Sequence, residues 1–364
     1  MSAIIVGGGI VGLTTALTLH RSGIEVRVFE EAPKIKELGL GLNVLPHSVQ
    51  HLVELGLQAR LDAEGVRTGE LRFFCKQGKA IWQEPRGMNA GYVVPQYSIH
   101  RGRLQSILKE QVIKRLGRDA LVTDRRLVKF ENRASEVTAT FENGAGDTII
   151  EKGEYLIGAD GINSIVRQQL YPNQGDPHFA GLMLWRGSTL ADSFLTGNTM
   201  IMAGHSDQKV VVYPISDPDE SGKQLINWVA EFRVPIETVH RDDWNSEGLL
   251  DEFGGRFSDW NFDWLDLPEL FRQADHIYKF PMVDRDPIEQ WSFDRVTLAG
   301  DAAHAMYPNG SNGASQGILD AVSLEQQLSD NSDVSTAFAK YEQERRPPTS
   351  QLILENRKTG PEKV

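Results

Sequence analysis

The sequence predicts an α/β fold, α+β overall, in which a parallel-sheet domain carries an inserted, largely antiparallel sheet and ends in a C-terminal helix. Three observations support this prediction. The 364 residues exceed the length at which a single core usually stops growing. Short apolar runs at 3–6, 155–157 and 296–299 each lead into a glycine-bearing turn, as buried parallel strands do. Between 177 and 280, strand-like runs alternate with Gly, Asp, Ser and Asn.

These patterns also predict where the domains begin and end. The parallel-sheet domain is predicted to comprise 1–70, 98–176 and 281–345, the inserted sheet domain 71–97 and 177–280, and the C-terminal helical segment 346–364. The runs LRFF and AIWQ, within 71–82, are expected to join the inserted sheet. Pro347 and Pro348 are expected to stop the last helix, which then resumes.

Charge and cysteine content exclude several classes of function. The net charge of −12 argues against nucleic acid, because phosphate binding needs a cationic face, and against an anionic membrane surface. Cys75 is the only cysteine, which excludes an internal disulfide and a Cys–Cys metal site, and no metal site is predicted. The apolar first nineteen residues lack the basic start and cleavage site of a signal peptide. A cytoplasmic protein is the simplest interpretation.

The first thirty residues read as a strand, a G-x-G-x-x-G turn, a helix over 10–20 and a second strand over 25–29. The glycines of this turn are Gly7, Gly9 and Gly12. They permit a tight turn, let a pyrophosphate approach the backbone, and let helix and strand pack closely. Glu30 ends the second strand, where an acid accepts hydrogen bonds from ribose hydroxyls; a solvated glutamate beside Glu31 is the alternative. This Rossmann-like unit predicts dinucleotide binding, and it leaves NAD and FAD both open.

The stretch 300–317 reads GDAAHAMYPNGSNGASQG and follows the apolar run VTLA. No charged residue other than histidine stands between Asp301 and Asp320, in a chain where 24% of residues are charged. A loop that lays its backbone against a large bound molecule has this composition, and an ordinary turn is the alternative. A helix is predicted over 314–328, and the positive end of its dipole would face a molecule bound at this loop.

Three motifs together resemble those of one enzyme family. GGGIVG with Glu30, GADGINSIVR and GDAAHAMYPNGSNGASQGILDA resemble the single-component FAD-dependent aromatic hydroxylases, the flavoprotein monooxygenases of the para-hydroxybenzoate and salicylate hydroxylase type. The motifs lie in family order and bracket nearly the whole chain. Four further stretches most resemble the phenazine-modifying monooxygenases of this family: PQYSIHRGRLQ (95–105), MLWRG (183–187), KFPMVDRDP (279–287) and MYPNGSNGASQ (306–316).

The resemblance implies a reaction and its partners. It implies tightly but non-covalently bound FAD, NADH or NADPH as a transient reductant, and dioxygen. A flavin C4a-hydroperoxide would hydroxylate a small aromatic or N-heteroaromatic molecule, phenazine-like or hydroxybenzoate-like, in a monomer or homodimer. The alternatives are an FAD-dependent reductase or dehydrogenase without oxygen insertion, and a nucleotide-binding protein without activity. A halogenase is disfavoured because the Trp-x-Trp-x-Ile signature is missing.

The resemblance also assigns residues to FAD. The implied cofactor-binding residues are Gly7, Gly9, Gly12, Glu30, Glu31, Leu42, Asn43, Arg101, Gln105, Leu127, Asp160, Gly161, Gly300, Asp301, Ser311, Asn312, Gly313 and Ala314. Arg101 as a surface cation, Gln105 as a solvated amide and Asp160 as a helix cap are the alternatives. Ser311 departs from the commoner Gly-Gln-Gly pattern of the family and must adopt a backbone conformation usually given to glycine.

The substrate is expected between the inserted sheet and the cofactor domain. Candidate substrate-binding residues are Trp185, Met202, Tyr213, Trp228 and Tyr307, and candidate catalytic residues are Pro308, His304, Tyr213 and Arg186. Alternation along a strand puts Trp185 and Arg186 on opposite faces, so at most one of them lines the cavity. Core packing of the tryptophans, a structural ion pair of Arg186, and a hydrogen bond of His304 within the GDAAH turn are the alternatives.

Overall fold

The computed structural model describes residues 3–35, 40–235 and 246–359. Its first layer is a six-stranded sheet in the order β21-β22-β12-β1-β2-β8, parallel except for β21. Its strands are β1 (Ala3–Val6), β2 (Val26–Phe29), β8 (Leu121–Val122), β12 (Leu156–Gly158), β21 (Ser292–Phe293) and β22 (Val296–Leu298). These are the short apolar, β-branched runs of the sequence, and β1 and β12 are buried along their whole length.

Helices cover one face of this sheet and a small second sheet covers the other. The helices are α1 (Ile10–Arg21), α4 (Arg101–Leu116), α9 (Asn312–Asp330) and, outside α9, α10 (Val334–Thr359). The opposite sheet comprises β9 (Arg126–Asn132), β10 (Val137–Glu142) and β11 (Thr148–Gly153), which the sequence analysis did not predict. Phe141 of β10 stacks on Phe29 of β2 with ring centroids 4.6 Å apart, so the two sheets share one core.

The inserted sheet has eight strands in the order β17-β20-β13-β16-β15-β14-β5-β6. In chain order they are β5 (Glu70–Phe74), β6 (Ala80–Pro85), β13 (His178–Asp192), β14 (Thr199–His205), β15 (Gln208–Pro214), β16 (Lys223–Arg233), β17 (Ser246–Glu247) and β20 (Ile277–Asp284). Only β14 and β5 pair in parallel. The predicted antiparallel sheet is therefore present, and the LRFF and AIWQ runs join its edge as β5 and β6. Residues 236–245 of the predicted insert lie outside the described residues.

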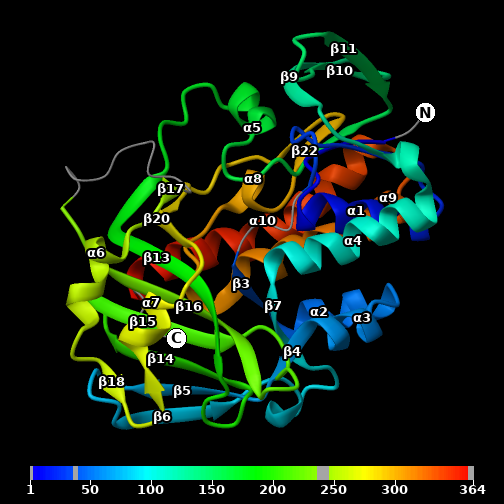
Figure 1. Ribbon diagram of the computed structural model, residues 1–364. Coiled ribbons are helices and arrows are strands. Elements are labelled where there is room, and N and C mark those ends of the chain that lie inside the picture. The colour runs from blue at the N-terminus through cyan, green and yellow to red at the C-terminus, as the bar shows by residue number, and fades with distance from the viewer. Residues whose placement is uncertain (1–2, 36–39, 236–245, 360–364) are drawn as a thin grey trace.

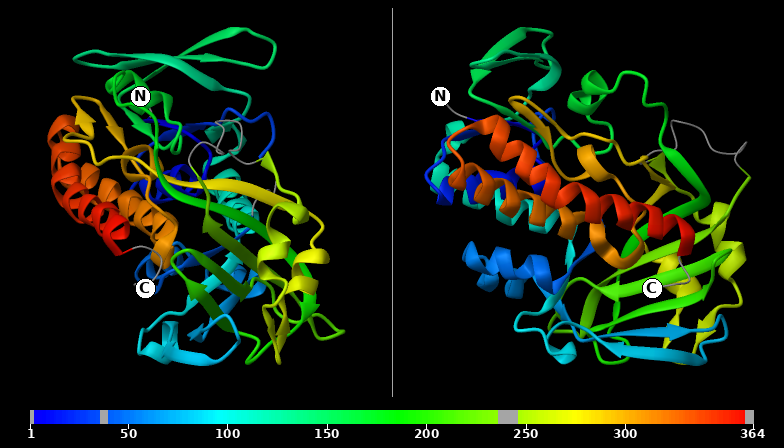
Figure 2. Two further views of the ribbon diagram at one scale, coloured as in Figure 1. Left: turned by 90° about the vertical axis from the view of Figure 1, so that its left-hand side faces the viewer. Right: turned by 180° about the vertical axis from the view of Figure 1, so that it is seen from behind.

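Shorter elements connect and cover the two large sheets (Figures 1 and 2). They are β3 (Gly41–Val44), β4 (Gly65–Thr68), β7 (Gln96–His100), β18 (Asn261–Phe262), β19 (Leu265–Asp266), α2 (Pro46–Glu54), α3 (Gln58–Glu64), α5 (Ile165–Leu170), α6 (Leu250–Phe253), α7 (Leu267–Arg272) and α8 (Asp301–His304). In the rear view of Figure 2, α9 and α10 lie side by side across the back of the parallel-sheet domain.

The predicted stop at Pro347 and Pro348 is wrong, because α10 continues through both prolines. Each proline removes a backbone hydrogen bond from the helix and destabilises it by about 3 kcal/mol. Tertiary anchors on both sides hold it. Before the prolines, the Tyr341 hydroxyl donates to the Leu298 carbonyl at 2.9 Å. After them, Arg357 pairs with Asp284 at 2.6 Å.

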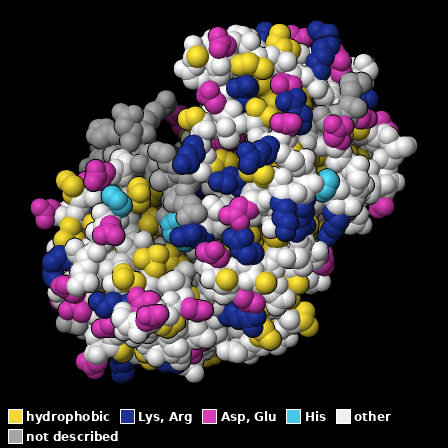
Figure 3. All heavy atoms as spheres, turned by 45° about the vertical axis from the view of Figure 1, so that its right-hand side comes forward, with side chains coloured by type: hydrophobic (Ala, Val, Ile, Leu, Met, Phe, Trp, Pro, Cys, Tyr) yellow, Lys and Arg dark blue, Asp and Glu magenta, His cyan; other side chains and the backbone are white. Residues whose placement is uncertain are grey.

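The surface mixes charges of both signs. On the face drawn in Figure 3, acidic and basic side chains are interspersed and hydrophobic side chains are scattered among them. No helix in the described part of the chain combines the length and the apolar character needed to cross a bilayer.

Candidate active site

A cavity of about 780 Å³ opens at the carboxyl ends of β1, β2 and β12 and reaches the inserted sheet. Most of the residues predicted to bind the cofactor line it: Gly7, Gly9, Glu30, Glu31, Leu42, Asn43, Arg101, Gln105, Leu127, Asp160, Gly161, Asp301, Ser311, Gly313 and Ala314. Ligands of open α/β sheets bind at this edge, where the strands end. The cavity has the size of those that hold cofactors and other small ligands.

The glycine turn has the shape of a pyrophosphate cradle. Gly7 has a φ of +106°, and a Cβ there would lie 2.3 Å from the Ala159 carbonyl oxygen. Nothing lies within 4 Å of the Cβ position of Gly9, which leaves its backbone open to a ligand. A Cβ on Gly12 would lie 1.9 Å from the Gly7 carbonyl oxygen. Gly12 therefore does not line the cavity; it lets α1 pack against the turn.

Glu30 closes one end of the cavity. Its carboxylate accepts hydrogen bonds from the Gly8 and Ala32 N–H groups, at 2.7 Å and 2.9 Å. Both bonds fix the side chain beside the glycine turn, in the position where the fingerprint places the ribose acceptor.

The sequence analysis missed several residues of the same wall. They are Val6, Ile10, Val11, Phe29, Gly41, Arg125, Arg126, Ala159, Asn163, Ile165 and Met306. Arg125 is the most informative of them, because its Nε is buried and has no hydrogen-bond partner among the described residues. Two consecutive arginines directly before Leu127 were the available signal.

Residues from α4 and from the turn before α5 line the middle of the cavity. The Gln105 amide donates to the Gly8 carbonyl at 2.8 Å, which joins α4 to the glycine turn. Asp160 caps α5, because its carboxylate accepts from the Ile165 and Val166 N–H groups at 2.8 Å and 3.2 Å. Burial raises the pKa of Asp160, and these hydrogen bonds oppose that rise. The capping alternative for Asp160 is thus realised, although the residue also lines the cavity.

Asp301 faces the cavity from the first turn of α8. Gly300 before it has a φ of +60°, and a Cβ there would lie 2.7 Å from the Val11 side chain. Gly300 therefore supports the turn without lining the cavity. The low-polarity surroundings of Asp301 raise its pKa, while the charges of His304 and Arg101 oppose that rise. The Asp301 carboxylate faces the cavity and can accept hydrogen bonds from ligand hydroxyls.

The loop before α9 follows the strained path that the sequence predicts. Ser311 adopts the left-handed conformation, with φ +59° and ψ +30°, directly after Gly310 at φ +67°. The helix begins at Asn312, two residues earlier than predicted. Asn312 does not line the cavity, whereas the next two residues do, so the helix dipole is directed at this end of the site.

A second cavity of about 90 Å³ adjoins the first on the side of the inserted sheet. Asn43, Arg186, Tyr213, Pro308 and Ser311 line both cavities. The other walls of the second cavity are Leu184, Met200, Met202, Lys209, Val211, Val229, Glu231, Asn309 and Gly310. The sheet thus presents mostly apolar side chains to this space, with a few charged groups among them.

Three predicted substrate contacts do not reach either cavity. Trp185 stacks on Phe232 with ring centroids 4.5 Å apart, on the opposite face of the sheet from Arg186, as strand alternation predicts. Trp228 shares that aromatic core, and its indole N–H donates to the Thr189 hydroxyl at 3.1 Å. Both tryptophans thus lie in the core of the inserted sheet, as the core-packing alternative expects, and neither lines a cavity.

Tyr307 also packs away from the site, in an apolar cluster with Leu182, Leu184, Val229 and Met282. It lines neither cavity. Pro308, the next residue in the chain, lines both of them.

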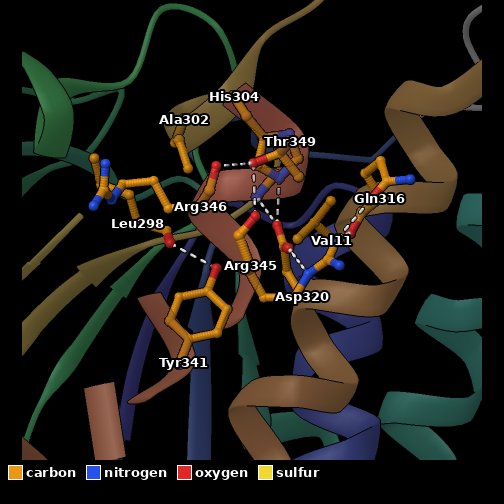
Figure 4. Close-up of polar contacts among 12 residues, drawn as sticks. Val11, Leu298, Ala302, His304, Gln316, Asp320, Tyr341, Arg345, Arg346 and Thr349 are labelled. Carbon is orange, nitrogen blue, oxygen red and sulfur yellow. Dashed lines mark hydrogen bonds and ion pairs between the residues drawn. The ribbon is translucent and has the colours of Figure 1, made fainter. Parts of the chain in front are cut away.

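His304 lies behind the cofactor loop and lines neither cavity. Its Nε2 lies 2.6 Å from the Asp320 carboxylate, and both side chains are fully buried (Figure 4). The same carboxylate accepts from the Gly300 N–H and from the Arg345 guanidinium, each at 2.9 Å. This network ties α9 and α10 to the turn that presents Asp301.

Comparison with known proteins identifies the family. A profile described as an FAD binding domain matches residues 1–356. The chain belongs to this FAD-binding family. It is 44% identical over 360 residues to phenazine 1,6-dicarboxylic acid hydroxylase PhzS of Lysobacter antibioticus, covering 97% of this chain and 88% of that one. It is 31% identical to 3-hydroxybenzoate 6-hydroxylase of Klebsiella oxytoca, covering 99% and 88%.

Solved structures agree on the fold. Klebsiella pneumoniae HpxO, complexed with FAD and uric acid, superposes with a TM-score of 0.80 at 24% identity, over 98% of this chain and 87% of that one. The glycine cradle and the buried Arg125 Nε also fit FAD, because its pyrophosphate needs N–H donors and a cation, and the Glu30 carboxylate is an acceptor for its ribose hydroxyls. This member of the FAD-binding family is therefore an FAD-dependent monooxygenase of the aromatic-hydroxylase type.

Proposed function

We propose that this FAD-dependent monooxygenase hydroxylates a small aromatic or N-heteroaromatic acid, of the phenazine-carboxylate class. Arg186 carries the proposal. Its side chain stands in the wall common to both cavities and donates to the Gly41 carbonyl at 2.9 Å. Its Nε is buried and has no hydrogen-bond partner in the described ranges. A buried cation with a spare donor is stabilised by a carboxylate that binds beside it.

The names of the relatives support an acid as the substrate. Both relatives described above are named for aromatic acids, a phenazine dicarboxylic acid and a hydroxybenzoate. The phenazine enzyme has the higher identity, which favours the tricyclic class for this chain. We also infer dioxygen as co-substrate, NADH or NADPH as electron donor, and a cytoplasmic location where such a donor is supplied, as a monomer or homodimer.

Bound FAD supplies the redox chemistry, and the chain's own residues position the substrate for it. The apolar face formed by Met200, Met202 and Val211 packs against a flat ring and excludes water. Burial raises the pKa of Tyr213 to about 12, against the opposing charge of Arg186. Tyr213 therefore stays protonated at neutral pH and serves as a hydrogen-bonding group for a substrate oxygen, not as a general base. Pro308 lines both cavities and adds no charge where the ring would meet the cofactor.

The test measures NADH and NADPH oxidation, oxygen uptake and peroxide release by the FAD-loaded protein. Phenazine-1-carboxylate, 3-hydroxybenzoate and 6-hydroxynicotinate are compared. We expect the phenazine acid to accelerate NAD(P)H oxidation most, with little peroxide and a product that contains one new oxygen atom. Oxidation at one slow rate with every compound would contradict the proposal and favour a reductase without oxygen insertion.

A further inference from the structure

The second cavity contains a buried ion pair that the reaction described above does not use. Lys209 of β15 and Glu231 of β16 stand directly opposite each other in the sheet, with Nζ and Oε1 3.2 Å apart. Their side chains are 8% and 4% exposed, and both line the cavity. They share a sheet face with Tyr213 and Val229, which also border this space.

Fold stability does not account for such a pair. Removing two charges from water is costly. A protein in which apolar residues of similar volume replace a buried ion pair is often as stable as the original. Around the pair, the wall is built from apolar side chains such as Leu184, Met200 and Met202. A charged pair retained among them offers a donor and an acceptor side by side to whatever enters the cavity.

The charges of the cavity indicate which ligand it suits. Among the described residues that line it, the charged side chains are Arg186, Lys209 and Glu231. Lys209 and Glu231 neutralise each other, so the lining carries one net positive charge. One carboxylate on the ligand balances that charge. A second carboxylate beside the pair would meet a cation already neutralised by Glu231, and it would lose its hydration without compensation.

We propose that the Lys209–Glu231 pair is a specificity filter that accepts an aromatic monoacid and rejects a second carboxylate at the far end of the ring system. This inference rests on the proposed function, because it takes Arg186 as the partner of the first carboxylate. Glu231 is the repulsive element, since a like charge placed beside the second carboxylate weakens the complex with the wrong ligand. Lys209 holds the Glu231 side chain in place through the 3.2 Å ion pair.

The test compares two tricyclic probes that differ by one group. Phenazine-1-carboxylate has one carboxylate, and phenazine-1,6-dicarboxylate has a second at the opposite end. Each is titrated into the FAD-loaded protein, and the dissociation constant is obtained from the change in the flavin absorbance spectrum and from calorimetry. We expect the wild-type protein to bind the monoacid about tenfold or more tightly than the diacid. Glu231→Gln should bring this ratio close to one, chiefly by tightening the diacid.

Two variants keep the result interpretable. The double variant Lys209→Met/Glu231→Leu removes the pair without leaving a lone buried charge, and it should fold and lose the preference. Glu136→Gln breaks the exposed Lys152–Glu136 pair, whose atoms lie 2.7 Å apart on the β9–β11 sheet, and should leave the ratio unchanged. Equal wild-type affinities, or a ratio unmoved by Glu231→Gln, would overturn the filter alone. Failure of both acids to bind would overturn the proposed function as well.

Discussion

Replacing the buried Asp320 by asparagine is expected to destabilise the protein and to weaken FAD binding. The carboxylate accepts hydrogen bonds from Gly300, His304 and Arg345, at 2.9 Å, 2.6 Å and 2.9 Å. An amide has no negative charge and turns an NH₂ group towards one of these donors. Breaking a buried ion pair by removing one partner costs about 3–5 kcal/mol. The turn that holds Asp301 against the cavity loses its support at the same time.

Urea denaturation of the FAD-loaded protein measures the first effect, and FAD fluorescence quenching measures the second. Asp330→Asn is the matched control, because Asp330 is an exposed carboxylate at the end of the same helix. The control should change the free energy of unfolding by less than about 0.5 kcal/mol. If Asp320→Asn lowered the free energy of unfolding by less than about 1 kcal/mol and the variant bound FAD normally, the network would not support the turn and the reasoning would be refuted.

The pH dependence of stability tests the same network independently. Burial alone would raise the pKa of Asp320, but the charges of His304 and Arg345 and the hydrogen bonds lower it to about 2. The folded value lies below the ordinary value of 3.8, so the contribution is complete above pH 3.8 and is lost as pH falls through about 2. A shift of this size corresponds to a free energy on the order of 2 kcal/mol. Asp320→Asn should lack this component of acid destabilisation.

Three further substitutions test other parts of the site. Gly12→Ala would place a Cβ 1.9 Å from the Gly7 carbonyl oxygen, so the variant should purify without flavin absorbance. Ser311→Gly relieves a φ of +59° and should raise the free energy of unfolding by about 0.5–1 kcal/mol in urea; a loss of stability would contradict the strain. Arg186→Gln should weaken binding of phenazine-1-carboxylate about 10- to 100-fold in spectral titration while FAD affinity changes little, and an unchanged affinity would remove Arg186 as the carboxylate partner.

Most residues on the cofactor side of the cavity could be predicted from the sequence, because the local backbone conformation there requires particular residue types. Three features reflect what the neighbouring backbone requires: the glycines of the first turn, Glu30 at the end of β2, and the uncharged loop before α9. The unusual backbone of Ser311 was predicted for the same reason, since it replaces a residue that permits positive φ.

Fewer residues on the substrate side could be predicted, because their position depends on which face of the inserted sheet is turned to the cofactor. Alternation separates Trp185 from Arg186 but does not say which of them faces FAD. The Asp320 contacts join α8, α9 and α10. The spacing of these residues in the sequence does not indicate that the three helices come together. The predicted helix stop at Pro347 was wrong for a related reason. Contacts with residues distant in the sequence hold α10 together where local helix propensity would end it.

The order of the elements along the chain has a consequence for biosynthesis. β1 and the glycine turn are made first, the inserted sheet is made next, and α9 and α10 follow only after residue 311. On the ribosome, the strands of the inserted sheet meet while the turn around Gly300 still lacks Asp320 and Arg345. The contacts that support this turn can therefore form only after α9 and α10 have been synthesised.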